Sequence, residues 1–412
     1  MQSRSGGRLV VLVISQVLAG VGVASGIAVG GLLAERLSGT VALAGFAQTS
    51  SVLGAGLWAI PLARLAGRRG RRWGLAAGYL LALLGTGLIL LAAAVHLVPL
   101  LFVGTAAFGA ATAAGLQARF AAAEVVGLRY RARALSVVMW ATTLGSVAGP
   151  NLSELGSRFG RGLGIEPLTG PYLFSLVAFA GAAVVLSVGI AGRVPVDQDQ
   201  DPARPVTPVR ATGLIPALRA GLRNPTTRLA IVAVICSHTI MVGVMVMTPL
   251  HMTHHGMTLD LVGLVLSIHI FGMYGASPIM GWLTDRLGGP AVIGIGVIIF
   301  AAALVLGGFA DTTQGPVISL ALGLLGLGWS AGMIGGSSLL ASAVSDHDRV
   351  SLQGGTDALM NLAAAGSSAL SGLVMGLAGF PALNVIAAVV AVPMAVLALR
   401  GLLVRPAVTP ES

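Results

Sequence analysis

Two apolar stretches of the chain each carry a pair of metal-binding side chains four residues apart. Met241 and Met245 form the first pair, and His269 and Met273 form the second. Four residues are close to one helical turn, so both members of a pair lie on the same helix face. Thioether sulfur favours soft ions such as Cu(I), and imidazole suits copper, zinc and nickel. The spacing therefore predicts a site for a soft metal ion.

Further histidines and methionines surround the two pairs. His238 precedes Met241 by three residues and extends the same helix face by one turn. Methionine also fills gaps between apolar helices, whereas a histidine inside a membrane span is usually functional. We expect the segment between the pairs to be a loop that either gathers metal before entry or is an ordinary polar connection. Met252 and Met257 also lie in this segment, and the secondary set of ligands is His238, His251, His254 and His255.

The composition is typical of a membrane protein. Of 412 residues, 56% are hydrophobic and 9% are charged, whereas a soluble domain has about 25% charged residues. The apolar residues divide into runs near the ~20 residues that a spanning helix needs. We therefore expect an all-α membrane protein with twelve transmembrane helices. The runs cover residues 8–34, 41–63, 73–95, 98–120, 134–152, 171–192, 229–251, 260–283, 290–309, 315–343, 353–377 and 381–404.

The basic residues indicate how the helices cross the bilayer. All 24 are arginines, and the net charge is +10. They gather after the second, fourth and sixth predicted spans, whereas the opposite loops hold only Arg36, Arg158 and Arg161. This distribution follows the positive-inside rule and predicts that both termini are cytoplasmic. The charge thus orients the chain in lipid and gives no sign of a nucleic-acid partner. A chain without lysine also lacks the phosphate-binding loop of P-loop NTPases, and we expect no enzyme activity.

The chain is predicted to have two matched halves. The polar, proline-rich stretch 194–226 separates a six-helix bundle at 1–193 from a second six-helix bundle at 227–412, as a cytoplasmic linker does. The segment 281–288 corresponds to 63–70 at an offset of 218 residues, and the same offset pairs Arg131 with Arg349. Matched halves predict transport by rocking about a central site near the membrane midplane.

The segment Gly281-Trp-Leu-Thr-Asp285-Arg286-Leu-Gly288 resembles the signature loop of the major facilitator superfamily. In the equivalent loop of the first half, Gly67 stands where that family usually has an acidic residue. This departure bears on the charge relay attributed to that loop. The resemblance covers the whole chain and implies the twelve-helix fold, a monomer and no cofactor. It also implies a conformational role for Gly281, Asp285, Arg286, Gly288, Arg68 and Gly70.

The M-x-x-x-M and H-x-x-x-M pairs on the seventh and eighth predicted spans resemble those of the CcoA-like copper importers, the CalT branch of this superfamily. That resemblance implies that Met241, Met245, His269 and Met273 handle copper, free or chelated, during uptake across the inner membrane. The copper would supply maturation of haem-copper oxidases, particularly the cbb3 type. Copper would then be the transported substrate and not a resident cofactor.

Two other features favour a different cargo. The sequence Gly145-x-x-x-Gly149-Pro150 is similar to a motif of drug and proton antiporters in the superfamily, although such glycines also allow close helix packing. Asp357 lies about five residues into a predicted span, where a carboxylate either couples to protons or is held by neighbouring amides. The alternative function is a proton-coupled exporter of small organic molecules. A metal sensor that does not transport is a third hypothesis.

Overall fold

The computed structural model describes residues 2–125, 131–189, 214–309, 311, 314–342 and 346–403, and all regular structure in these ranges is helical. Ten stretches of these residues are long and apolar enough to cross a membrane. The last one, Gly355–Leu403, holds 49 residues and is divided at Gly379, whose φ of 75° is not helical. Helix α6 (Arg131–Asn151) accounts for the one remaining predicted span. All twelve predicted spans therefore coincide with helices, and the all-α membrane fold is confirmed.

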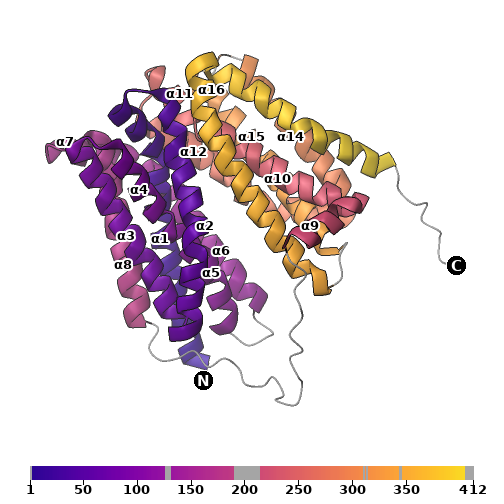
Figure 1. The fold of residues 1–412 in the computed structure, drawn as a ribbon, viewed down its shortest axis with the longest axis horizontal. Coiled ribbons are helices and arrows are strands. Elements are labelled where there is room, and N and C mark those ends of the chain that lie inside the picture. Colours follow the sequence, from indigo (N-terminus) through magenta and orange to yellow (C-terminus); the bar gives the residue numbers. More distant parts are fainter. Residues whose placement is uncertain are drawn as a thin grey trace. The chain divides into compact units, whose positions relative to one another are not determined.

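The chain forms two compact units, and the first is built mainly from the N-terminal half. Unit 1 takes in Met1–Pro205, Val246–Ser267 and Ser368–Leu377. In Figure 1, α1 lies beside α2, α6 and α8 within the indigo to magenta part of the ribbon. Besides α6, its helices are α1 (Gln2–Ser38), α2 (Ala44–Arg69), α3 (Arg71–Val95), α4 (Val98–Phe108), α5 (Ala110–Val125), α7 (Ser153–Gly162), α8 (Gly170–Gly189) and α11 (Thr248–His254).

Glycines let α1 and α6 pack backbone to backbone in unit 1. A Cβ atom on Gly145 would overlap the carbonyl oxygen of Val17, and one on Gly149 would crowd Ala24. The hydroxyl of Ser25 donates a hydrogen bond to the Gly149 carbonyl at 3.0 Å. In this structure the glycine motif of α6 therefore serves close helix packing.

Unit 2 takes in Val206–Met245, Ile268–Ser367 and Ala378–Ser412. Its helices are α9 (Leu214–Arg223), α10 (Pro225–Met245), the end of α12 (Leu259–Tyr274), α13 (Ser277–Leu287), α14 (Gly289–Phe309), α15 (Gly315–Ser342) and most of α16 (Asp346–Leu403). Small residues on α15 admit its neighbours: Gly328 contacts Phe300 of α14, and Gly332 contacts Ser237 of α10. Helix α15 is thus packed between other helices of the unit.

Three predicted spans are interrupted. The fourth breaks at Gly109 between α4 and α5, the seventh breaks after Met245 between α10 and α11, and the eighth breaks between α12 and α13. Part of the predicted linker forms helix α9, while its residues 194–213 lie outside the described ranges. The division into bundles at 1–193 and 227–412 stays a prediction.

The two matched loops have the same backbone geometry. Gly70 follows α2 with a φ of 100°, and Gly288 follows α13 with a φ of 83°. Each donates its N–H to the carbonyl four residues earlier, at 2.9 Å in both cases. Only glycine adopts such φ values without strain. The repeat with an offset of 218 residues is therefore present in the structure at this position.

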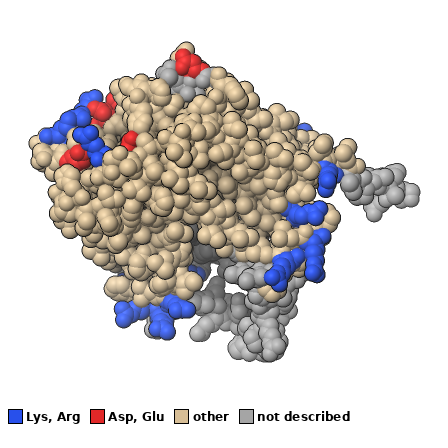
Figure 2. Space-filling model, turned by 45° about the horizontal axis from the view of Figure 1, so that its top comes forward, with Lys and Arg blue, Asp and Glu red and all other residues tan. Residues whose placement is uncertain are grey.

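Charged side chains are sparse on the surface. In the face drawn in Figure 2, arginine and acidic side chains form small separate groups, and the broad area between them consists of other residues. Arg68, Asp285 and Arg286 are exposed, and the Arg286 guanidinium lies 4.4 Å from the centre of the Trp282 ring. An uncharged surface of this kind suits contact with lipid.

Candidate functional site

His269 and Met273 lie on one buried face of α12. The imidazole of His269 is 1% exposed, and its Nδ1 donates a hydrogen bond to the Leu322 carbonyl of α15 at 2.9 Å. The proton of the neutral ring is then on Nδ1, which leaves a lone pair on Nε2. Nε2 is buried and has no hydrogen-bond partner among the described residues. Gly326 of α15 packs against the backbone between His269 and Met273, so this face of α12 is held tightly against α15.

Met241 and Met245 lie in the last two turns of α10. Met241 is 3% exposed, whereas Met245, the final residue of the helix, is half-buried. Helix α10 also packs against α15, through Ser237 at Gly332. The two predicted pairs thus belong to two helices that contact the same neighbour. It stays a prediction that Nε2 of His269 and the sulfurs of Met241, Met245 and Met273 form one ligand set.

Carboxylates and further histidines do not complete a metal site here. In the part of the chain that the structure describes, no group of three or more His, Cys, Asp and Glu side chains is placed to hold a metal ion. A metal bound between these helices would depend on methionine sulfur. Such a site would select a soft ion and would be poor for Mg²⁺ or Ca²⁺.

His238 belongs to a cluster of three rings. Its Nδ1 accepts a hydrogen bond from Nε1 of Trp329 at 3.1 Å. The indole of Trp329 in turn meets the ring of Tyr274 edge to face, with 5.6 Å between ring centres and 73° between ring planes. These side chains come from α10, α15 and α12 and are half-buried or exposed. Sequence reasoning singled out His238 but missed Trp329 and Tyr274, because nothing distinguishes an aromatic residue in an apolar helix.

The other three secondary histidines, His251, His254 and His255, lie in unit 1, on and beside α11. The expectation of a loop is wrong for His251 and Met252, which are helical and buried. Pro249 is suited to the first turn of this helix. Proline has no backbone N–H, and the N–H groups of a first turn make no hydrogen bond within the helix. His255 donates from Nδ1 to the His251 carbonyl at 2.8 Å, and their ring centres are 4.4 Å apart.

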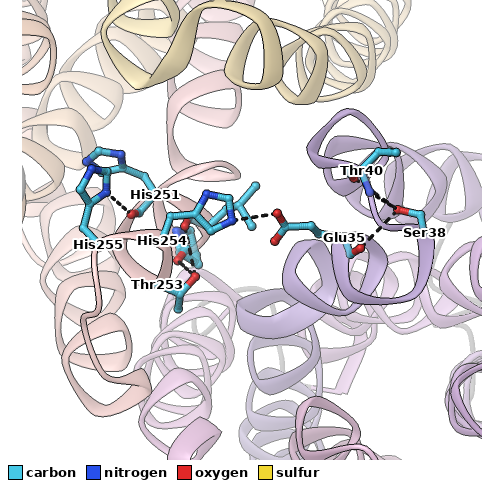
Figure 3. Close-up of polar contacts among 9 residues, drawn as sticks. Glu35, Ser38, Thr40, His251, Thr253, His254 and His255 are labelled. Carbon is cyan, nitrogen blue, oxygen red and sulfur yellow. Dashed lines mark hydrogen bonds and ion pairs between the residues drawn. The ribbon is translucent and has the colours of Figure 1, made fainter.

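His254 points away from this pair and toward Glu35 at the end of α1, as Figure 3 shows. Its Nε2 lies 2.8 Å from the carboxylate oxygen of Glu35. A pocket of about 510 Å³ adjoins the contact and is lined by Glu35, Arg36, Thr253 and His254 together with apolar residues. Arg36 also approaches Glu166 at 4.0 Å. The described part of this region combines acidic, basic and imidazole groups in one small polar cluster.

A second ionic group of unit 1 surrounds Glu154 in α7. Arg158 and Arg161 bond to the same carboxylate oxygen, at 3.0 and 3.1 Å. The hydrogen bond and the charge of Glu154 raise the pKa of Arg158 above its ordinary value. Arg158 also reaches Asp260 of α12 at 3.8 Å. Nearby, the amide of Asn151 donates to the hydroxyl of Ser267 at 2.6 Å. Within unit 1, polar contacts therefore join residues 246–267 to α6 and α7.

Asp357 lies in α16 and is exposed. The amide of Asn361 donates to the backbone carbonyl of Asp357 at 2.8 Å, as expected for amides one helical turn away. This bond engages the main chain of Asp357. Proton coupling through Asp357 stays a prediction.

The long apolar helices and their sparse charges define a multi-pass membrane protein. The chain belongs to the Major Facilitator Superfamily, whose family model matches residues 11–276 and 230–412. This match confirms the resemblance of the signature loop to that family. Members of the family are transporters and not enzymes.

Curated relatives match nearly the whole chain. It is 35% identical over 386 residues to "Uncharacterized MFS-type transporter YdeG" of Bacillus subtilis (strain 168), covering 92% of this chain and 88% of the relative. It is 28% identical over 384 residues to "Riboflavin transporter RfnT" of Brucella anthropi, covering 91% of each. No copper importer is among these relatives, so the finer resemblance to the CcoA-like branch has no support from them.

Solved structures share the fold at low sequence identity. A bacterial homologue of the human lysosomal transporter Spinster, in an inward-facing and unoccupied conformation, has a TM-score of 0.73 at 16% identity, with 97% of both chains covered. The xylose transporter XylE from E. coli, in a partially occluded inward-open conformation, has a TM-score of 0.70 at 16% identity and covers 100% of both chains. At such identities the likeness establishes the fold alone.

Proposed function

We propose that this chain is a proton-coupled secondary transporter that carries a small organic solute by alternating access. The observation that carries the proposal is the ring cluster of unit 2, in which His238, Tyr274 and Trp329 come together from three helices. A solute with polar and apolar parts needs a site that offers both kinds of contact. The indole and phenol rings supply apolar surface, and the imidazole supplies a polar group.

The position of Trp329 on α15 supports this assignment. Leu320 is 55% exposed and apolar, as a lipid-facing residue is. Trp329 follows it by nine residues, or about two and a half helical turns, so the two side chains lie on opposite faces of α15. Trp329 therefore faces away from the lipid side, between the contacts that α15 makes with α10 and α12. Its partial exposure is suited to a solute rather than to lipid.

One named relative agrees with an organic cargo, because RfnT is described as a riboflavin transporter. Asp357 is our candidate for the proton-coupling carboxylate in this chain. We place the protein in the bacterial plasma membrane as a monomer, with both termini cytoplasmic.

The polar contacts of unit 1 suit the moving parts of such a cycle. Glu35 with His254, Asn151 with Ser267, and Arg158 with Asp260 each join a residue of the first half of the sequence to one of the second half. Alternating access requires the two halves to separate at one side of the membrane and then at the other. Exposed pairs of this kind contribute little stability each, so they can open and re-form during transport.

Binding of the solute tests the proposal directly. Ligands that bind the folded state raise its melting temperature by mass action. We expect the purified protein to be stabilised by a member of a panel of sugars, nucleosides and flavins, and not by Cu(I) supplied as a soluble chelate. Stabilisation by Cu(I) alone would refute the proposal.

Copper import is the second candidate, and the ring of His269 is the observation that favours it. Nδ1 is tied to a backbone carbonyl while Nε2 stays without a partner, which is the arrangement that most metal-bound histidines show. Met273 follows one turn later on the same buried face. Isotopic copper uptake separates the candidates: a copper importer loses uptake in Met241→Ala, Met245→Ala, His269→Ala and Met273→Ala, whereas an organic-solute transporter shows no copper uptake to lose.

A further inference from the structure

The hydrogen bond from Trp329 to His238 fixes what each ring of the cluster can offer a ligand. An indole N–H is a donor only, and Trp329 uses it on Nδ1 of His238 at 3.1 Å. Trp329 therefore presents only its aromatic surface to a third molecule. Because Nδ1 of His238 accepts this bond, the ring is neutral and carries its proton on Nε2. His238 thus offers one N–H donor beside the indole.

The ring of Tyr274 sets the orientation of the Trp329 indole. Tyr274 stands at 73° to Trp329, with 5.6 Å between the ring centres. Edge-to-face packing with a neighbour restrains the rotation of the indole. The hydrogen bond to His238 restrains it from the other side. Trp329 is therefore a fixed flat surface with a hydrogen-bond donor at its edge, and it lies on the face of α15 that is turned away from Leu320.

We propose that this cluster selects solutes that contain a planar conjugated heterocycle with a carbonyl or imine acceptor on its edge. The heterocycle stacks on Trp329, and its acceptor accepts a hydrogen bond from the Nε2–H of His238. This inference rests on the proposed transport of an organic solute and names its chemical class. A flat ring gains from stacking on the indole, whereas a sugar or polyol alcohol offers no flat surface of that kind. A metal ion gains nothing from a donor N–H.

The test uses the full-length protein in lipid nanodiscs with three probes. Riboflavin contains a flat, carbonyl-bearing ring and a ribityl chain; lumichrome is the flat ring alone, and ribitol is the chain alone. We expect riboflavin and lumichrome to bind with similar dissociation constants and ribitol to show no binding. Binding of ribitol with an affinity equal to that of riboflavin would overturn the inference.

Variants locate the binding at the cluster. Trp329→Leu is expected to raise the Kd for lumichrome about tenfold, whereas Trp329→Phe, which keeps a stacking ring, raises it less than about threefold. Trp282→Leu is the matched control, because Trp282 is a 52% exposed tryptophan of α13 outside the cluster. His238→Leu is expected to weaken lumichrome binding about fivefold, and His238→Gln, which keeps an N–H donor, less.

The outcomes separate this inference from the proposed function. If Trp329→Leu keeps the wild-type Kd while the protein still binds and carries an organic solute, the cluster is not the selecting site and only the inference falls. If the wild-type protein binds no organic solute and takes up copper instead, the proposed function falls with it. A melting curve of each site variant, compared with that of the wild-type protein, shows whether that variant is folded.

Discussion

His254 of unit 1 meets the carboxylate of Glu35 at a partly exposed helix end, whereas His238 and His269 of unit 2 lie among helices and bond to neutral partners. Histidine thus has a different role in each unit. Beside a carboxylate at a partly exposed helix end, an imidazole makes a contact that contributes little stability and can open and re-form. Held by an indole or a carbonyl, it keeps one tautomer and one orientation. We infer that unit 1 carries the contacts that open and close, and unit 2 carries the groups that recognise the cargo.

The largest effect is expected where α12 meets α15 in unit 2. Gly326→Val places a side chain against the His269 carbonyl and the Met273 backbone nitrogen, and such overpacking costs about 3 kcal/mol. We expect a strong fall in melting temperature. Gly366→Val is the control, because a Cβ atom there has nothing within 4 Å. Equal melting temperatures for the two variants would contradict the tight fixation of the His269 ring.

Removing the two kinds of histidine gives the next largest contrast. His269→Ala deletes a buried side chain and its bond to Leu322, so we expect a loss of about 2–3 kcal/mol. His254→Ala removes an exposed contact and costs under about 1 kcal/mol. Thermal unfolding of the purified variants measures both values. A His254→Ala variant less stable than His269→Ala would reverse the comparison.

The matched loops of the two halves are expected to respond alike. Gly70→Ala and Gly288→Ala each force a residue with a Cβ atom into a positive φ, at a cost of about 1 kcal/mol. Gly281→Ala is helical, has open space around its Cβ position and is expected to be neutral or slightly stabilising. Melting temperatures that fall for only one loop glycine would show that the loops do not share one structural role.

The smallest effect belongs to the Glu35–His254 contact. A double-mutant cycle with Glu35→Gln and His254→Gln is expected to give a coupling energy below about 1 kcal/mol. Arg36 and Glu166 lie beside the pair and are left unmutated. Thermal unfolding of the four proteins of the cycle measures the coupling energy, and a value above about 2 kcal/mol would contradict a weak, exposed contact.

Local patterns in the sequence were sufficient to predict the helices. An apolar run marked every span, because a helix that crosses the hydrocarbon core of a bilayer must consist mainly of apolar residues. The offset between Gly70 and Gly288 was readable because only glycine adopts their backbone conformation. The breaks in the seventh and eighth spans were missed, although Pro249 and Pro278 mark the first turns of α11 and α13. A proline at such a position is the signal that would have found them.

The site was less predictable than the fold. Spacing placed His269 and Met273 on one helix face, and both are buried there. Spacing within one helix says nothing about which residues of another helix lie opposite, so Trp329 was invisible as the partner of His238. The contact between His254 and Glu35 joins residues 219 positions apart. Such pairs depend on tertiary packing, which no local motif encodes.

Transport by the purified protein in liposomes tests the central claim most directly. Radiolabelled riboflavin and isotopic Cu(I) are offered in parallel to the same vesicles, which carry an inward or an outward proton gradient. The account predicts that riboflavin accumulates with one direction of the gradient, that Asp357→Asn abolishes this dependence, and that copper enters no faster than into empty liposomes. Copper accumulation that requires His269 and Met273, without riboflavin uptake, would contradict it.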